Sequence, residues 1–208
     1  MTPTDSAEGT VQAPRYLEGP AEVVGDVHLR IRYFTYRTDK GLVAGRNTSH
    51  LFTIDRPARD IWPIVSDFNL WHNPAGYFYS GVLRDLYSSE ERDLGSGTFR
   101  ITVKKPNEPD LETDDYVVLN VVPEHLIVLF QPVPTDGSNG GLSPGFHVIT
   151  LNEHDGKTVV TFYTEHASRT RDKTEEEALA PFRETADETL RRFRDVFIPT
   201  LKRLVDES

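Results

Sequence analysis

The last third of this chain constrains its fold most, because a strand signature there runs directly into one long amphipathic helix. A turn at Gly156 precedes a β-branched and aromatic run at residues 159–166, which predicts a strand. After a charged linker, residues 174 to about 207 predict a helix, and Thr174 with Glu177 has the spacing of a capping box. A sheet with a helical rod packed across it is therefore expected.

The predicted helix carries one apolar stripe. At about 100° per residue, its hydrophobic side chains share an arc of roughly 140°. The members of the stripe are Leu179, Phe182, Ala186, Leu190, Phe193, Val196, Phe197, Leu201 and Leu204. Phe182 and Phe193 are candidate ligand contacts, because this stripe should face the interior. Pro199 should kink the last turns of the helix.

Composition narrows the class of protein. A chain of 208 residues suits one domain with a core large enough to contain a cavity. No apolar run has the length of a membrane span, and the first residues lack the features of a secretory signal, so a cytoplasmic protein is expected. Cysteine is absent, which excludes disulfides and thiolate zinc sites. The net charge of -10 argues against nucleic acid and anionic membranes as partners.

The N-terminal part divides into two segments. Residues 1–20 are polar and rich in Gly, Pro and acidic groups, and they are expected to form a disordered tail. Residues 21–47 are expected to form an additional strand or hairpin, because Val27, Leu29 and Ile31 alternate with polar residues. This extension could cover a sheet edge or form a homodimer contact.

Residues 48–206 are expected to form the main domain. His50–Asp55 predicts a strand, Pro57 suits the first turn of a helix capped by Asp55, and Pro63 should limit that helix to little more than its first turns. A second short helical segment follows and ends at Pro74. Further strands are predicted at about 81–89, 97–104, 112–122, 125–131, 145–152 and 158–168.

This order resembles the START-like (SRPBCC) superfamily, the helix-grip fold of Bet v 1 allergens, polyketide cyclase/dehydratases and START lipid-transfer domains. The resemblance rests on FTIDRPARDIW at 52–62, VSDF at 65–68, Trp71, LGSGT at 94–98, VVPEHL at 121–126 and DGKT at 155–158. It implies an α+β fold in which a curved antiparallel sheet of about seven strands wraps on the C-terminal helix, with two short helices after the first core strand. It also implies a pocket between sheet and helix that takes an apolar or aromatic small molecule.

Three histidines are the sharpest candidates for chemistry. Period two places His50 on the inward face with Phe52, His147 with Ile149, and His166 with Thr164 and Phe162. If the last strand pairs antiparallel with both the first core strand and the penultimate one, the three imidazoles should converge at one end of the sheet. Acid–base catalysis by His147 and His166, ligand contact by His50 and Thr164, a His-bound Zn²⁺, and simple burial in the core all remain open.

Aromatic residues supply the other candidate ligand contacts. Trp71, Tyr77 and Tyr79 follow the short helices, where related folds close the pocket, although packing beneath the helices is an equal alternative. Tyr116 lies on a middle strand whose inward face the pattern does not fix. No phosphate-binding Gly-rich loop, HExxH helix or GxSxG elbow is present in the sequence, and no cofactor is expected.

These features together predict binding of an aromatic or polycyclic small molecule, in a polyketide cyclase/dehydratase-like enzyme that uses His acid–base chemistry. A non-catalytic carrier or sensor, a His-metal hydrolase or lyase, and a protein-binding module are the alternatives, because the fold alone does not choose among them.

Overall fold

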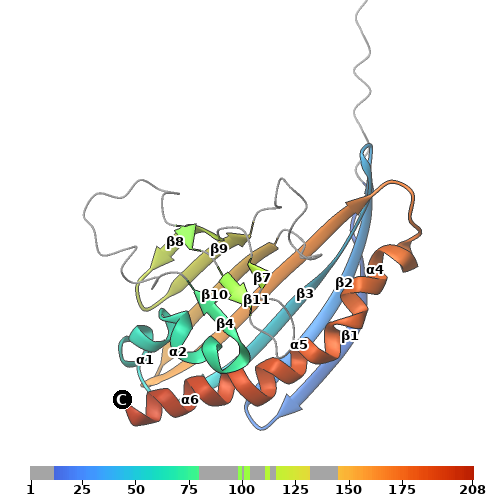
Figure 1. The fold of residues 1–208 in the computed structure, drawn as a ribbon. Helices are drawn as coiled ribbons and strands as arrows, with labels where there is room; N and C mark the ends of the chain where they lie inside the picture. The colour runs from blue at the N-terminus through green and yellow to red at the C-terminus, as the bar shows by residue number, and fades with distance from the viewer. Residues whose placement is uncertain (1–11, 80–97, 100, 104–110, 113–115, 132–144) are drawn as a thin grey trace, which may run out of the picture.

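The structure is a computed structural model of the whole chain that describes residues 12–79, 98–99, 101–103, 111–112, 116–131 and 145–208. Eight strands form one antiparallel sheet in the order β1-β2-β3-β11-β10-β9-β8-β5. A bent helical segment crosses one face of that sheet, with the short helices at its C-terminal end (Figure 1). This is the expected α+β helix-grip architecture.

The strands of the large sheet have these bounds: β1 Arg15–Val24, β2 Val27–Thr38, β3 Gly41–Ile54, β5 Thr98–Phe99, β8 Tyr116–Val122, β9 Leu126–Gln131, β10 Gly145–His154 and β11 Lys157–Thr170. A second, three-stranded sheet consists of β4 (Tyr77–Tyr79), β6 (Ile101–Val103) and β7 (Leu111–Glu112). The expected strand at 81–89 lies outside the described residues.

The N-terminal segment forms part of the main sheet. β1 begins at Arg15, and residues 15–18, which belong to the segment expected to form a disordered tail, are paired with β2. Pro20 is tolerated because β1 is an edge strand and its pairing shifts between Glu18 and Ala21. β3 runs unbroken from Gly41 to Ile54, across the expected boundary between extension and main domain.

Two short helices follow β3. α1 (Ala58–Val65) passes through Pro63 and is longer than the sequence suggested. Its first residue donates its backbone N–H to Glu153 Oε2 over 2.9 Å, while the expected cap, Asp55, pairs with Lys157 instead. α2 (Phe68–His72) continues into a 3₁₀ turn (Asn73–Ala75).

The C-terminal helix, the name used here for residues 175–207, consists of α4 (Glu175–Glu184), α5 (Ala186–Arg192), a π-helical turn (Phe193–Phe197) and α6 (Ile198–Glu207). The capping box of Thr174 and Glu177 is confirmed. The π-turn comes directly before Pro199, which has no N–H and whose ring would crowd the carbonyl of Asp195 in a regular helix. The expected kink is therefore present as a widened turn.

The core lies between the sheet and the C-terminal helix. Ile31 of β2, Phe52 of β3, Val160 of β11, Ile127 of β9 and Leu201 of α6 are completely buried there. α1 and α2 pack against α6 at one end of this core. The face of the sheet turned toward the C-terminal helix is called the inner face below.

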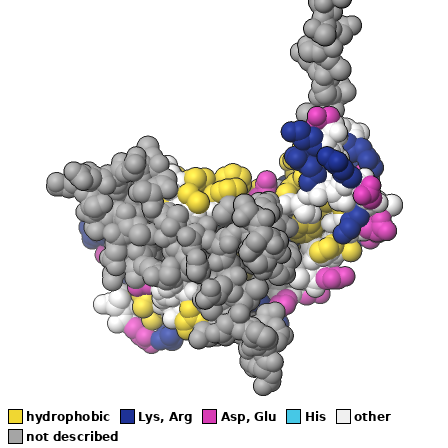
Figure 2. All heavy atoms as spheres, turned by 45° about the horizontal axis from the view of Figure 1, so that its top comes forward, with side chains coloured by type: hydrophobic (Ala, Val, Ile, Leu, Met, Phe, Trp, Pro, Cys, Tyr) yellow, Lys and Arg dark blue, Asp and Glu magenta, His cyan; other side chains and the backbone are white. Residues whose placement is uncertain are grey.

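Charged side chains mark the opposite end of the sheet. Figure 2 shows Lys and Arg side chains gathered there, with Asp and Glu beside them. Arg37 and Lys40 at the β2–β3 turn and Arg171 after β11 are exposed residues of this end. The described surface there carries charges of both signs. In the described part of the chain, no helix has the length and apolarity needed to cross a membrane.

Candidate functional site

A polar row runs along the inner face of β3. Arg46, Thr48 and His50 alternate with outward-facing residues and continue the face that Phe52 and Ile54 bury. Thr48 is 1% exposed and His50 is 0% exposed. Two fully buried polar side chains in succession are unusual on a core-facing strand, so this row is the starting point of the site.

His50 is held against an aromatic ring of the C-terminal helix. Its imidazole lies 3.8 Å from the ring centre of Phe193, at an angle of 29°. Burial, with a smaller contribution from the charge of Arg46, lowers the pKa of His50 from 6.5 to about 3. The ring is therefore neutral near pH 7. Neither of its nitrogens has a hydrogen-bond partner among the described residues, and the same is true of Thr48 Oγ1.

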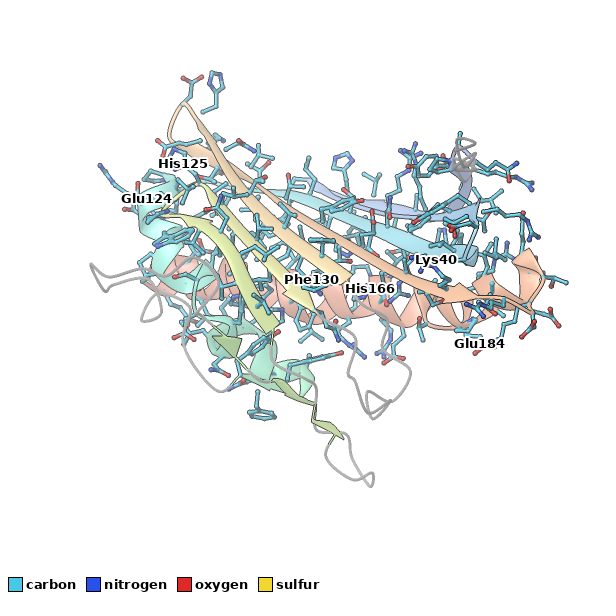
Figure 3. The ribbon with its side chains drawn as sticks, turned by 90° about the horizontal axis from the view of Figure 1, so that it is seen from above. Lys40, Glu124, His125, Phe130, His166 and Glu184 are labelled. Atoms are coloured by element: carbon cyan, nitrogen blue, oxygen red, sulfur yellow. The ribbon has the colours of Figure 1, made fainter. Side chains whose placement is uncertain are left out.

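His147 and His166 form a second part of the site. Their rings lie 5.2 Å apart and nearly perpendicular, at 81°. His147 is opposite Thr164 in the β10–β11 register, and His166 is opposite Gly145. Burial lowers the pKa of His147 well below 6.5, helped by the charges of His166 and His72. Figure 3 shows His166 midway along the sheet, where β11 passes over the C-terminal helix.

Gly145 makes room for the His166 ring. A Cβ atom at this position would lie 2.5 Å from His166 Nδ1 and 2.6 Å from the carbonyl oxygen of Glu165, closer than van der Waals contact allows. Any larger residue would move the imidazole or the strand. Because Gly145 of β10 has no side chain, the His166 ring of β11 can occupy its observed position.

The expected convergence of three strand histidines is only partly present. The predicted antiparallel pairings of β11 with β3 and β10 are confirmed. However, the register places His50 opposite Phe162, and His166 opposite Arg46. His50 is therefore two inward positions away from His166 along the sheet, and it stacks on Phe193 instead.

His72 of α2 was missed by the sequence analysis. Its ring lies 3.6 Å from that of Trp71, 4.4 Å from Phe197 and 5.3 Å from Tyr79. Burial in this aromatic surrounding lowers the pKa of His72 to about 3. The spacing of Phe68, Trp71 and His72, which share one helical face, is the signal that could have found it.

Trp71 and Tyr79 anchor α2 to its surroundings. Trp71 is 1% exposed, packs edge-on against Phe162 at 5.1 Å, and donates Nε1–H to the carbonyl of Val65. Tyr79 is held through its backbone: its N–H donates to Asn69 Oδ1, and its carbonyl accepts from Asn69 Nδ2. Both aromatic side chains adjoin His72.

Tyr77 faces the middle of the C-terminal helix. Its hydroxyl accepts a hydrogen bond from Arg192, whose guanidinium also lies over the Tyr77 ring at 5.0 Å from the centre. Burial raises the pKa of Tyr77, so the phenol stays protonated. Arg192 also pairs with Glu188 one turn earlier.

The remaining predicted residues are placed as follows. Thr164 is half-buried on the inner face, opposite both Thr48 and His147. Phe182 is buried, and its carbonyl accepts from Arg46. Tyr116 lies on β8 opposite Phe99, and its side chain lies outside the described ones. In the described ranges, no three His, Asp or Glu side chains are arranged to hold a metal ion.

This arrangement suits hydrogen bonding better than proton donation. His50 and His72 have pKa values of about 3, so each ring offers one N–H and one lone pair at neutral pH. Aromatic faces surround them: Phe193 at His50, and Trp71 and Phe197 at His72. An apolar lining with a few fixed polar groups is typical of small-molecule sites.

No protein-family model matches the chain, and no curated protein matches it. Among solved structures, a protein of unknown function from Staphylococcus aureus matches with a TM-score of 0.53 and 11% identity, over 77% of this chain and 94% of that one. A protein from Nitrosomonas europaea matches with a TM-score of 0.50 and 15% identity, over 77% and 94% respectively. Norcoclaurine synthase from Thalictrum flavum matches with a TM-score of 0.45 and 16% identity, over 80% and 89%. The first two likenesses show a shared fold.

Proposed function

We propose that this protein binds a small aromatic or polycyclic molecule between the inner face of its sheet and the C-terminal helix. The observation that carries the proposal is the pair of fully buried polar side chains, Thr48 and His50, whose polar atoms have no hydrogen-bond partner among the described residues. Leaving such a group unsatisfied costs about 1–3 kcal/mol. A ligand that hydrogen-bonds to both side chains removes that cost.

The surrounding rings support an aromatic ligand. Phe193 touches both His50 and Phe197, and Phe197 lies edge-on to Trp71. Flat side chains of this kind favour stacked or edge-on contacts with a flat ligand. The aromatic contacts come from the C-terminal helix and from α2, so the ligand would lie where three elements meet.

A calorimetric titration tests this proposal. 2-Naphthamide has two fused rings and one amide that can pair with Thr48 and His50, whereas benzamide has only one ring. The protein should bind 2-naphthamide at a single site and more tightly than benzamide. Binding removes from water the apolar surface of the second ring, which benzamide lacks. Native mass spectrometry of the purified protein would also show whether a small molecule co-purifies with it.

A matched pair of variants locates the site. Phe193→Ala removes a ring from the inner side and should weaken 2-naphthamide binding by about tenfold or more. Phe146→Ala removes a ring that is 44% exposed on the outer face and should leave binding unchanged. Absence of saturable binding, or an equal loss in both variants, contradicts the proposal.

Acid–base catalysis, as in a polyketide cyclase or dehydratase, is the second candidate function. The contact between the rings of His147 and His166 favours it. Because His147 is neutral near pH 7, it would act as the proton acceptor, and bound substrate would have to raise its pKa. His147→Ala should then abolish turnover while leaving substrate affinity largely intact, whereas a carrier would show only a loss of affinity.

A further inference from the structure

Arg46 is a half-buried cation on the same inner row as Thr48 and His50. Its Nη1 donates to Thr185 Oγ1 at 2.8 Å and to the carbonyl of Phe182 at 3.3 Å, both on the C-terminal helix. Its Nε is buried and has no hydrogen-bond partner among the described residues. The guanidinium is thus held through Nη1, while its Nε–H donates no hydrogen bond to the described part of the chain.

No described carboxylate neutralises Arg46. Its two acceptors, Thr185 and Phe182, are neutral groups. Burial lowers the pKa of Arg46, and the like charge of Arg192 adds to that effect, while Tyr33 opposes it. Arg192 has its own partners in Glu188 and the Tyr77 hydroxyl. A guanidinium remains protonated in such surroundings, so a partly buried positive charge persists here.

The unused atoms of this row point to one kind of ligand group. Successive inner positions on a strand are about 6.6 Å apart, and an Arg side chain spans that distance, so Arg46 Nε can approach the same ligand atoms as the neighbouring Thr48. The charge of Arg46 already affects the His50 ring. An N–H from Arg46 and an O–H from Thr48 together form a pair of donors.

We infer that the bound molecule carries a carboxylate, and that Arg46 binds it with Thr48. This inference rests on the proposed function and names the ligand class: an aromatic or polycyclic carboxylic acid. The Nε edge of a guanidinium matches the two oxygens of a carboxylate, and such charge-assisted bonds are about twice as strong as neutral ones. A carboxylate would also neutralise the partly buried cation that the described residues leave uncompensated.

A matched pair of probes tests the inference. 2-Naphthoate and 2-naphthamide have the same rings and nearly the same shape, and only the first carries a charge. Calorimetric titration near pH 7 should show about tenfold or tighter binding of 2-naphthoate by the unaltered protein. A preference of about threefold or less overturns the inference, and this result needs no variant.

Variants then assign the preference to Arg46. Arg46→Gln should weaken 2-naphthoate binding by about 30-fold or more while changing 2-naphthamide binding by less than about threefold. Arg46→Lys keeps the positive charge but lacks the paired N–H donors of a guanidinium, so it should retain part of the preference for 2-naphthoate over 2-naphthamide. Arg183→Gln is the control, because Arg183 pairs with Glu176 and lies over the Tyr33 ring at the same end of the helix; it should change neither affinity.

The outcomes separate the two proposals. If both probes bind equally well to the unaltered protein and to Arg46→Gln, the carboxylate inference fails and the aromatic-binding function stands. If neither probe binds, the proposed function itself fails. If Arg46→Gln does not fold, Arg46→Lys and the acid-to-amide ratio of the unaltered protein decide.

Discussion

The imidazole of His50 lies 3.8 Å from the ring of Phe193, so a strand residue and a helix residue that are 143 positions apart meet in the centre of the molecule. The contact keeps His50 completely buried and neutral. It also joins the polar row of β3 to the aromatic stripe of the C-terminal helix.

The first prediction concerns stability at mildly acid pH. The pKa of His50 is about 3 in the folded protein and near 6.5 in the unfolded chain. Between these values the unfolded state binds the extra proton, so the free energy of unfolding falls as the pH falls below 6.5. From pH 7 to pH 5 this one group should cost about 2 kcal/mol.

Urea unfolding at both pH values measures this effect. His50→Leu should remove most of that loss, because it removes the group that must be protonated on unfolding. His154→Leu is the matched control, since its side chain is 89% exposed at the β10–β11 turn. An equal pH dependence in the His50 variant and the unaltered protein would show that His50 does not titrate differently in the two states.

The second prediction concerns Thr48, whose buried hydroxyl lacks a hydrogen-bond partner among the described residues. Thr48→Val replaces the hydroxyl with a methyl group of similar shape. The free energy of unfolding should stay the same or rise by up to about 1 kcal/mol, while affinity for 2-naphthamide falls about three- to tenfold. A variant that is at least as stable but binds more weakly would show that the Thr48 hydroxyl serves ligand binding and not folding.

Thr161→Val is the control for that experiment. Thr161 lies on the same strand as Phe162 but on the opposite face of the sheet, and it is half-buried. Its substitution should leave the affinity unchanged. A loss of more than about 1 kcal/mol in Thr48→Val would instead assign the hydroxyl a structural hydrogen bond.

Much of the fold could be predicted from the sequence because its signals are local. The alternation along β3 and β11, the capping box at Thr174 and the apolar stripe each depend on residues close together in the chain. Ile198 and Val205 are buried in addition to the expected stripe, because the π-turn before Pro199 rotates the last turns of the helix.

The site was harder to predict because it depends on register and on contacts between distant elements. Period two places His50 inward, but only the β3–β11 register separates it from His166. Nothing near Arg46 in the sequence indicates that Thr185 and Phe182 fix its guanidinium. His72 joins the site only because α2 packs against the C-terminal helix, where the His72 ring meets Phe197.

The third prediction concerns Gly145. Gly145→Ala places a methyl group on His166 and on the Glu165 carbonyl, so the protein should lose about 1–3 kcal/mol of stability. Urea unfolding measures the loss. Adding His166→Ala removes the contact with the ring but not the one with the carbonyl, so it should restore only part of the stability. Full stability in the single variant would contradict the close packing described for this pair of strands.

The fourth prediction concerns Asp26, in the turn between β1 and β2. Its carboxylate accepts from the backbone N–H of Thr53 at 2.9 Å and from Lys202 Nζ at 2.8 Å, which ties the N-terminal hairpin to β3 and α6. Asp26→Ala should cost about 1–2 kcal/mol, because a charged partner of a backbone N–H is lost.

Lys202→Met separates the two contributions of Asp26. It removes the partly exposed ion pair and the contact of the Lys202 ammonium with the Phe52 ring, and it should cost less than about 1 kcal/mol. Chemical unfolding of both variants gives the comparison. A larger loss in Lys202→Met than in Asp26→Ala would mean that the ion pair, and not the bond to Thr53, holds the hairpin.

The most direct test of ligand binding at the inner face is a titration of the protein with 2-naphthamide, followed through the side-chain nitrogen signals of its histidines by NMR. The signals of His50 should shift and saturate together with the calorimetric binding curve, while those of exposed His154 stay in place. Saturable binding that shifts His154 and leaves His50 unchanged would contradict a site between β3 and the C-terminal helix.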